Sequence, residues 1–297
     1  MKKGSIGVVI VNYNGARYQN DALRTIYAST YRDIEVIVVD SASRDDSVAL
    51  AKKEFPQAHY LPQPENVGVA KGNNIGIKYA VDVLDTEYVL LINNDIELDA
   101  DAFAELMAKA NENTVTVPKI YYYDPQDMLW FAGGEMYWNK GESGHIGNFE
   151  TDHGQYDRER VIGYAPTCCM LLHRSIFEKI GYIDETLFMY FDDTDLCVRL
   201  NDAGFRLLYV PTARMWHKVS SSGGGMDSKV YVYYNSRNKF YFMEKYRDRL
   251  VFPARLFTYT KLLAKFLLSP VYKKNDKYIL KAWRDYKHGK MGRCDDL

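Results

Sequence analysis

Residues 89–95 read Val-Leu-Leu-Ile-Asn-Asn-Asp, so four apolar residues lead directly into three polar ones. A short, unbroken apolar run of this kind is typical of a strand that is covered on both faces. Two earlier stretches repeat the pattern, residues 5–11 before Asn12-Tyr13-Asn14 and residues 34–39 before Asp40. The sequence therefore predicts three buried strands that each end on polar side chains.

Segments with helical spacing of apolar residues alternate with these strands. Helices are expected over residues 20–29, 47–55, 73–83 and 99–110, and further strands over residues 58–61 and 115–119. This alternation predicts an α/β fold with a mostly parallel, Rossmann-like sheet and helices on both of its faces. Ligands of such sheets bind beyond the carboxyl ends of the strands, so we expect the polar strand ends to form the site.

The second half of the chain is less regular. Aromatic residues and glycines alternate without helical period over residues 120–160, which predicts a loop and hairpin insertion that closes over a substrate. Further elements are expected as a strand at 165–172, helices at 175–180 and 192–203, and a strand at 205–210 that ends at Pro211. Residues 211–228 are expected to form a loop that holds His217 and a Ser- and Gly-rich run. That run either presents backbone N–H groups to a diphosphate or is only flexible.

Composition limits the class of protein. The 297 residues are 47% hydrophobic and 26% charged, which is enough apolar material for a packed core. The four cysteines have no metal-ligand spacing, and no stretch of 18 apolar residues occurs, so we expect a reduced, cytoplasmic protein without a membrane span. The N-terminus lacks the apolar region and cleavage site of a signal peptide. The 25 tyrosines suit the stacking of sugars or reflect a compositional habit.

Charge is distributed unevenly along the chain. Residues 237–297 contain sixteen Lys and Arg but six Asp and Glu, whereas the rest of the chain has a surplus of eleven acidic residues. A basic tail on an acidic body predicts an anionic partner, and the apolar residues between the charges favour a membrane over a nucleic acid. The tail has one apolar side, which resembles an interfacial helix on lipid but is equally consistent with packing on the domain. This side comprises Leu256, Tyr259, Leu263, Phe266 and Leu267, with Arg255, Lys261 and Lys265 around it.

Two strand-end carboxylates are candidates for ligand contacts. Asp40 is suited to accept the N3–H of uracil or thymine while Tyr13 stacks on the ring, and equally suited to cap the Ser-rich turn that follows it. Asp95 follows an apolar strand, where a carboxylate is costly unless it meets a cation. Mg²⁺ and Mn²⁺ prefer oxygen ligands, and the neighbouring Asn93 and Asn94 favour this interpretation over a simple turn residue.

Acidic residues also open one of the predicted helices, at Asp192, Asp193 and Asp195. Acids in this position favour the helix dipole, and Asp195 stands four residues before Arg199, a good spacing for an ion pair. We therefore assign Asp195 a structural role and keep Asp193 as the candidate general base for an acceptor hydroxyl. His217 is a candidate metal ligand beside one carboxylate, although a lone histidine is more often structural.

Five motifs occur in order and with regular spacing. They are Val8-Val9-Ile10-Val11-Asn12-Tyr13-Asn14-Gly15, Val38-Val39-Asp40-Ser41-Ala42-Ser43, residues 65–76 (Glu-Asn-Val-Gly followed by Gly-Asn-Asn-Ile-Gly), Leu91-Ile92-Asn93-Asn94-Asp95, and residues 188–199 around Asp192-Asp193. Together they resemble the inverting glycosyltransferases of family 2, which have the GT-A fold, and among them the rhamnosyltransferase-like branch. The resemblance runs from about residue 6 to about residue 240, and five ordered motifs are far more specific than one.

The resemblance implies roles for individual residues. The nucleotide would contact Val11, Asn12, Tyr13, Asp40, Lys71, Asn74, Asn93 and Asn94. Residues 93–95 take the place of the family's DxD metal motif with Asn as its first residue, so Asp95, together with His217, would hold Mn²⁺ or Mg²⁺. Asp193 inherits the role of general base and Asp192 a supporting one. Residues 130–134 resemble a further segment of the branch, in which acceptor contacts would fall on Trp130, Gly133 and Gly134.

The resemblance also implies an organisation and a reaction. A GT-A catalytic domain would cover residues 1–240, divided into a nucleotide-binding half (1–119) and an acceptor and catalytic half (120–240). A basic, amphipathic helical extension (241–297) would follow. The enzyme, a hexosyltransferase of rhamnosyltransferase type, would move a sugar from a UDP- or dTDP-sugar to a hydroxyl of a lipid-linked or growing surface polysaccharide.

Partners and alternatives follow from the same comparison. We expect a glycan or glycolipid acceptor, peripheral contact of the basic tail with the inner face of the cell membrane and no nucleic acid, and we allow for a homodimer. Two alternatives stay open, a polyprenyl phosphate acceptor and a non-catalytic nucleotide-sugar-binding protein. A nucleotidyltransferase is disfavoured because residues 12–17 lack the Gly-rich loop with Arg and Lys that such an enzyme needs after its first strand.

Overall fold

The computed structural model describes residues 1–218, 225, 227–250, 260, 263–264, 267 and 274–297. Within these residues a ten-stranded sheet has the order β10-β12-β6-β11-β4-β1-β2-β3, with β5 paired to β12 and β7 paired to β6. Its strands are β1 (Lys2–Asn12), β2 (Ile34–Asp40), β3 (His59–Pro62), β4 (Thr86–Ile92), β5 (Ile96–Leu98), β6 (Thr114–Tyr122), β7 (Leu129–Phe131), β10 (Arg160–Ile162), β11 (Cys169–His173) and β12 (Arg206–His217).

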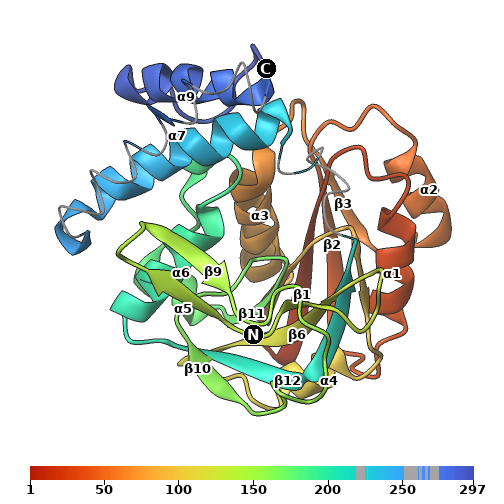
Figure 1. Cartoon of the computed structure of the whole chain (residues 1–297). Coiled ribbons are helices and arrows are strands. Elements are labelled where there is room, and N and C mark those ends of the chain that lie inside the picture. The colour runs from red at the N-terminus through yellow and green to blue at the C-terminus, as the bar shows by residue number, and fades with distance from the viewer. Residues whose placement is uncertain (219–224, 226, 251–259, 261–262, 265–266, 268–273) are drawn as a thin grey trace.

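Helices surround this sheet, and two of them, α7 and α9, lie side by side at one end of the molecule (Figure 1). The helices are α1 (Gln19–Tyr27), α2 (Ser47–Glu54), α3 (Gly68–Lys78), α4 (Ala102–Met107), α5 (Ser175–Ile180), α6 (Asp192–Asp202), α7 (Lys229–Lys245) and α9 (Tyr278–Lys287). A π-helical turn, Tyr79–Val83, extends α3. The strands β8 (Gly134–Tyr137) and β9 (Glu142–His145) form the hairpin that the composition of residues 120–160 predicts.

The parallel half of the sheet brings the three polar strand ends to one edge. β1 lies between β2 and β4 and runs parallel to both, with Asn12 opposite Asp40 and Ile10 opposite Ile92. β12 is parallel to β6, whereas β11 is antiparallel to both β4 and β6. The predicted α/β fold with a mostly parallel sheet is confirmed, with antiparallel strands added in the second half of the chain.

The predicted end of the last strand, at Pro211, is wrong. The strand expected to end at Pro211 continues to His217, so His217 lies at the end of a strand and not in a loop. The register of β12 against β6 shifts between Val210 and Arg214. Proline lacks a backbone N–H and is tolerated in a strand at such an irregularity, which is why Pro211 does not end β12.

Close packing of α3 on β1 explains two glycines. A Cβ atom on Gly72 would lie 2.8 Å from Val11 Cγ1, and one on Gly76 would overlap Val9 Cγ1. The side chain of Val11, expected near the nucleotide, thus faces α3. The two glycines let α3 lie close to β1, at the edge where the polar strand ends converge.

The C-terminal segment packs on α7. The hydroxyl of Tyr233 donates to Asp285 Oδ2 at 2.7 Å, and the fully buried Arg237 donates to the carbonyl oxygen of Gly292 at 2.7 Å. The N–H of Gly292 donates to the carbonyl oxygen of Thr186 at 2.9 Å. The end of the chain is therefore tied both to α7 and to the loop that precedes α6.

The predicted interfacial helix falls largely outside the described residues. Those outside are Arg255, Leu256, Tyr259, Lys261, Lys265 and Phe266. Leu263 and Leu267 are described and are exposed. Within the described part of the chain, no helix has the length and apolar character needed to cross a membrane.

The contact between α3 and β1 leads to a first prediction. Gly76→Ala should lower the free energy of unfolding by about 1–3 kcal/mol, because the added methyl group forces α3 away from Val9. Urea denaturation followed by circular dichroism measures this change. Lys53→Ala, on the exposed face of α2, is the control and should change stability by less than about 0.5 kcal/mol. Equal stability of the Gly76→Ala variant and the wild type would contradict the packing.

Candidate active site

The strand ends are joined by a buried amide, that of Asn12. Its Nδ2 donates to Asp40 Oδ1 and to Ser47 Oγ, both at 2.9 Å, and its Oδ1 accepts from Asn94 Nδ2 at 2.9 Å. Asn12 is fully buried and Asn94 nearly so. These two residues were expected to contact the nucleotide. In the structure their amide groups connect β1, β2 and the end of β4.

Asp40 and Tyr13 both lie at this edge, but Asp40 is buried and Tyr13 is exposed. Asp40 is buried and also accepts from Ser43, from the hydroxyl at 2.6 Å and from the backbone N–H at 3.1 Å. Asp40 therefore caps the turn that follows β2, which was one of its two predicted roles. A carboxylate has about four lone-pair sites, so its Oδ2 retains capacity for a further donor. Tyr13 is 41% exposed, which leaves its ring free to stack on a ligand.

Two other residues expected near the nucleotide belong to α3. Lys71 is exposed on α3. Asn74 is buried, donates to the carbonyl oxygen of Ile183 at 2.8 Å and accepts from the N–H of Ile183 at 3.0 Å. Its Nδ2 also lies 2.9 Å from Glu185 Oε1. Asn74 therefore anchors the loop that leads to α6 rather than reaching the cavity described next.

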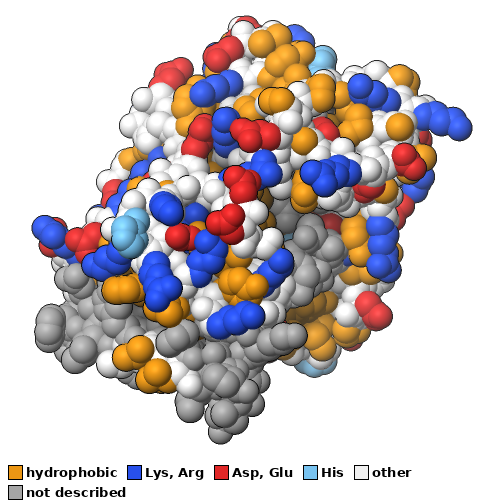
Figure 2. Space-filling view, turned by 90° about the horizontal axis from the view of Figure 1, so that it is seen from above, with side chains coloured by type: hydrophobic (Ala, Val, Ile, Leu, Met, Phe, Trp, Pro, Cys, Tyr) orange, Lys and Arg blue, Asp and Glu red, His pale blue; other side chains and the backbone are white. Residues whose placement is uncertain are grey.

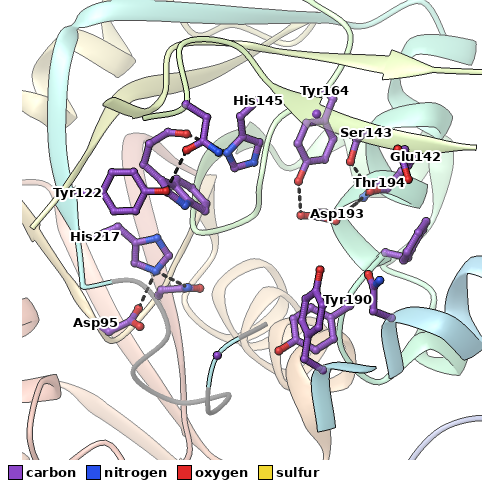
Figure 3. Close-up of a pocket in the computed structure, with 18 of the residues that line it drawn as sticks. Asp95, Tyr122, Glu142, Ser143, His145, Tyr164, Tyr190, Asp193, Thr194 and His217 are labelled. Carbon is purple, nitrogen blue, oxygen red and sulfur yellow. Dashed lines mark hydrogen bonds and ion pairs between the residues drawn. The ribbon is translucent and has the colours of Figure 1, made fainter. Parts of the chain in front are cut away.

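A cavity of about 940 Å³ opens beside the strand ends. One end of it holds Asn93, Asp95 and His217, and the other holds Asp193 (Figure 3). Trp130 lines the wall between them, whereas Gly133 and Gly134 do not line the cavity. A Cβ on Gly134 would lie 2.7 Å from the carbonyl oxygen of Tyr164, so that glycine allows a close backbone approach.

The residues expected to hold a metal ion meet at the first end. His217 Nε2 lies 3.1 Å from Asp95 Oδ1 and 3.4 Å from Asn93 Nδ2, and both Asp95 and His217 are buried. Neighbouring ligands of an octahedral cation with bonds of about 2.1 Å lie about 3.0 Å apart. The carboxylate and the imidazole therefore fit two positions around a divalent cation. No group of three or more His, Cys, Asp or Glu that could hold a metal ion occurs among the described residues, so the other positions would fall to phosphate and water oxygens.

The second end is built on the N-terminus of α6. Asp193 Oδ2 accepts from the hydroxyl of Tyr164 at 2.7 Å, and Oδ1 accepts from the N–H of Thr194 at 2.6 Å. Burial raises the pKa of Asp193, and the hydrogen bonds from Tyr164 and Thr194 oppose that rise. Asp192 is buried and does not line the cavity. Burial, and then the charge of Asp193, raises the pKa of Asp192 well above its ordinary value.

The third acid of α6 has the structural role that its spacing predicts. Asp195 pairs with Arg199 at 2.9 Å. It also accepts from Tyr246 at 2.8 Å and pairs with Lys245 of α7 at 2.7 Å. Asp195 therefore ties α6 to α7 and is not available to a substrate.

The loop before α6 has an unusual backbone. Phe188, Tyr190 and Phe191 have φ angles of 64°, 64° and 66°, a left-handed conformation that non-glycine residues rarely adopt. The buried side chain of Asn238 in α7 lies within 2.9 Å of the carbonyl oxygens of Leu187, Met189 and Tyr190. Asn238 thus holds the loop that delivers Asp193 to the cavity.

An aromatic wall connects the two ends of the cavity. The ring of Trp130 lies 4.8 Å from that of His217 and 4.4 Å from that of His145. His145 in turn stacks on Tyr164 at 5.8 Å, and Tyr164 hydrogen-bonds to Asp193. The wall therefore runs without interruption from the Asp95–His217 pair to Asp193.

A further part of the cavity lining comes from β9 and α7. Glu142 Oε2 pairs with Lys239 Nζ at 2.7 Å, and both residues line the cavity with Tyr231 and Asn235. Sequence reasoning missed this part of the lining, together with His145 and Tyr164. No local spacing marks Glu142, His145 or Tyr164 as site residues, since the hairpin and the sheet bring them together.

Comparison with known proteins identifies the family. Residues 7–181 match the profile of Glycosyl transferase family 2. A low-salt glycan biosynthesis hexosyltransferase, Agl10 of Haloferax volcanii, is 25% identical over 79% of this chain and 74% of its own length. An N-acetylglucosaminyl-diphospho-decaprenol L-rhamnosyltransferase of Mycobacterium tuberculosis is 26% identical over 77% of this chain and 81% of its own length.

Solved structures share the fold. GalNAc-T7 with UDP, GalNAc and Mn²⁺ superposes with a TM-score of 0.65 at 15% identity, over 96% of this chain and 56% of that one. TarS of S. aureus superposes with a TM-score of 0.54 at 17% identity, over 79% of this chain and 39% of that one. This chain thus spans about half the length of the first structure and less of the second, and the likeness establishes the GT-A fold.

The relatives are named as hexosyl- and rhamnosyltransferases, and the family match covers more than half of the chain. The chain is a glycosyltransferase with the GT-A fold and belongs to glycosyl transferase family 2.

Proposed function

We propose that this glycosyltransferase moves a sugar from a UDP- or dTDP-sugar to an acceptor hydroxyl, with inversion at the anomeric carbon. The observation that carries the proposal is that one cavity has the Asp95–His217 pair at one end and Asp193 at the other. A diphosphate at the first end and an acceptor hydroxyl at the second would place the transferred sugar between them. Attack then comes from the side opposite the leaving group, which inverts the configuration.

The donor would bind along the edge of the sheet. Asp40 at the end of β2 would accept the N3–H that uracil and thymine share, and Tyr13 would stack on the base. Asp95 and His217 would hold Mn²⁺ or Mg²⁺ against the diphosphate. When bound, the cation stabilises the negative charge that develops on the departing nucleoside diphosphate.

The acceptor would be activated by Asp193. Its carboxylate would take the proton of the hydroxyl as the oxygen forms a bond to the anomeric carbon and the bond from that carbon to the phosphate oxygen breaks. Tyr164 and Thr194 hold the carboxylate in place through three hydrogen bonds, at 2.7, 2.6 and 3.2 Å. Asp192 would support Asp193 from a buried position next to it that does not line the cavity.

The acceptor side suits a glycan or a lipid-linked glycan. Glu142 and Lys239 offer a hydrogen-bond acceptor and a donor, and Tyr231 offers a ring, which together match a sugar with several hydroxyls. Because Glu142 already neutralises Lys239, this part of the lining favours a hydroxyl acceptor over a polyprenyl phosphate. The relatives are named for glycan biosynthesis and for a decaprenol-linked substrate, which supports the same class.

The basic C-terminal region would bring the enzyme to the inner face of the cell membrane as a peripheral protein. Residues 237–297 have a surplus of ten positive charges. Figure 2 shows Lys and Arg side chains on the face that α7 and α9 form, beside hydrophobic ones. Trp283 is 40% exposed on α9, and Leu263 and Leu267 are exposed nearby in the chain. Cationic and apolar side chains in this combination favour anionic lipid.

Asp193→Asn tests the general base. We expect transfer to fall by about 10²-fold or more, because the amide cannot take the proton, while binding of UDP or dTDP stays unchanged. Product formation from a panel of UDP- and dTDP-sugars and calorimetry with the nucleotides measure the two quantities. Asp202→Asn, the same exchange at the exposed end of α6, is the matched control and should leave both as they are. Normal turnover of Asp193→Asn would remove this residue from the mechanism.

The pH profile tests the environment of Asp193. Burial raises its pKa, so kcat/KM should fall on acidification along a limb that lies above the ordinary Asp value of about 3.9. Tyr164→Phe removes a hydrogen bond that stabilises the carboxylate, and the limb should therefore move to higher pH. Tyr156→Phe, whose hydroxyl contacts Glu150 away from the cavity, serves as the control. A limb that stays in place in Tyr164→Phe would show that another group is titrating.

Thermal shift with nucleotides tests the donor and the cation together. UDP or dTDP should raise the Tm of the wild type more with Mn²⁺ than without it, since ligands that bind the native state stabilise it by mass action. Asp95→Asn should lose the Mn²⁺-dependent part of the shift, whereas Asp101→Asn, at an exposed position before α4, should keep it. If neither nucleotide stabilises the wild type, the proposed function is wrong.

A further inference from the structure

His145, in β9, lines the cavity midway along the aromatic wall. Its ring lies between those of Trp130, at 4.4 Å, and Tyr164, at 5.8 Å, and Phe131 packs against it at 5.3 Å. Figure 3 shows His145 on the wall between His217 and Tyr164. It therefore stands where the proposed mechanism places the transferred sugar, and that mechanism does not use it.

The hydrogen bond of His145 determines its tautomer. Nδ1 lies 2.9 Å from the carbonyl oxygen of Trp130. A carbonyl oxygen only accepts hydrogen bonds, so Nδ1 carries the proton, and in the neutral ring Nε2 carries a lone pair. Burial lowers the pKa of His145 to about 4, so the ring is neutral near pH 7.

Nε2 is the polar atom that this arrangement leaves for a ligand. No described residue makes a hydrogen bond to Nε2 of His145, and this atom is not fully buried. The aromatic rings on both sides of the imidazole, at angles of 80° and 22° to it, restrict its rotation. The lone pair is thus held in one direction before any ligand binds.

We propose that His145 is a specificity-determining residue that accepts, through Nε2, a hydrogen bond from a hydroxyl of the transferred sugar. The inference rests on the proposed function, because that function puts the sugar between the Asp95–His217 pair and Asp193. In this role the imidazole accepts a hydrogen bond and leaves the proton of the acceptor hydroxyl to Asp193. It selects donors with a free hydroxyl at the contacted position over deoxy or O-methyl sugars, which have no hydrogen to donate.

His145→Phe is the variant that separates this contact from packing. Phe keeps an aromatic ring between Trp130 and Tyr164 but has no acceptor. We expect the affinity for the preferred UDP- or dTDP-sugar and kcat/KM to fall by about 5- to 30-fold, in line with the loss of one hydrogen bond in a site built for a hydroxyl. Affinity for UDP or dTDP without a sugar should change by less than about twofold, since the contact is to the sugar.

Two further variants sharpen the test. His145→Gln keeps an amide oxygen close to the position of Nε2 and should recover part of the sugar-nucleotide affinity that His145→Phe loses. His59→Phe makes the same exchange at a histidine in β3 that does not line the cavity, and should leave binding and transfer unchanged. Calorimetry with UDP, dTDP and their sugar conjugates gives the affinities, and the transfer assay gives kcat and KM.

The outcomes distinguish this inference from the proposed function. Equal losses of affinity for the sugar nucleotide and for the bare nucleotide in His145→Phe would show that the ring only packs, and would overturn the inference. No change in either affinity would overturn it too. In both cases the effects of Asp193→Asn and Asp95→Asn would leave the proposed function in place. Failure of UDP and dTDP to bind the wild type would overturn both.

Discussion

The amide of Asn12 is the contact on which the arrangement of the polar strand ends depends. β1 is the strand between β2 and β4, and Asn12 at its end uses its Nδ2 for β2 and α2 and its Oδ1 for Asn94. A buried amide without hydrogen-bond partners destabilises the folded state. These hydrogen bonds therefore keep the ends of the three strands next to one another. Asp40, Tyr13 and Asp95 share an edge because of this arrangement, and Asp95 can then meet His217 from the far strand β12.

The acid end of the cavity depends on a second buried amide. Three non-glycine residues with positive φ precede α6, and each costs about 1–3 kcal/mol unless its surroundings hold it. Asn238 supplies such contacts through three carbonyl oxygens, and Gly292 reaches the same loop through Thr186. The C-terminal segment thus helps to hold the loop that carries Asp193, in addition to any contact that its basic charge would make with lipid.

Local pattern predicted the strands, their polar ends, the helix that starts at Asp192 and the structural pairing of Asp195 with Arg199. Each of these follows from residues close in sequence. It did not predict that β12 continues past Pro211, because the register shift that accommodates the proline depends on β6. It also did not separate the amides of Asn12, Asn74 and Asn94 from ligand contacts. The partners of a buried amide come from elements far apart in the chain, and so do the neighbours of His145.

The two adjacent acids at the start of α6, Asp192 and Asp193, differ in how readily they ionise. Asp192 is more completely enclosed, and burial together with the charge of Asp193 raises its pKa well above the ordinary range. Two adjacent buried carboxylates cannot both ionise cheaply, and the one with more hydrogen-bond donors ionises first. Asp193 has Tyr164 and Thr194 as donors, so the charge settles there and the proton stays on Asp192. In the proposed mechanism Asp192 would therefore support the base by remaining neutral, because Asp193 then has no second negative charge beside it.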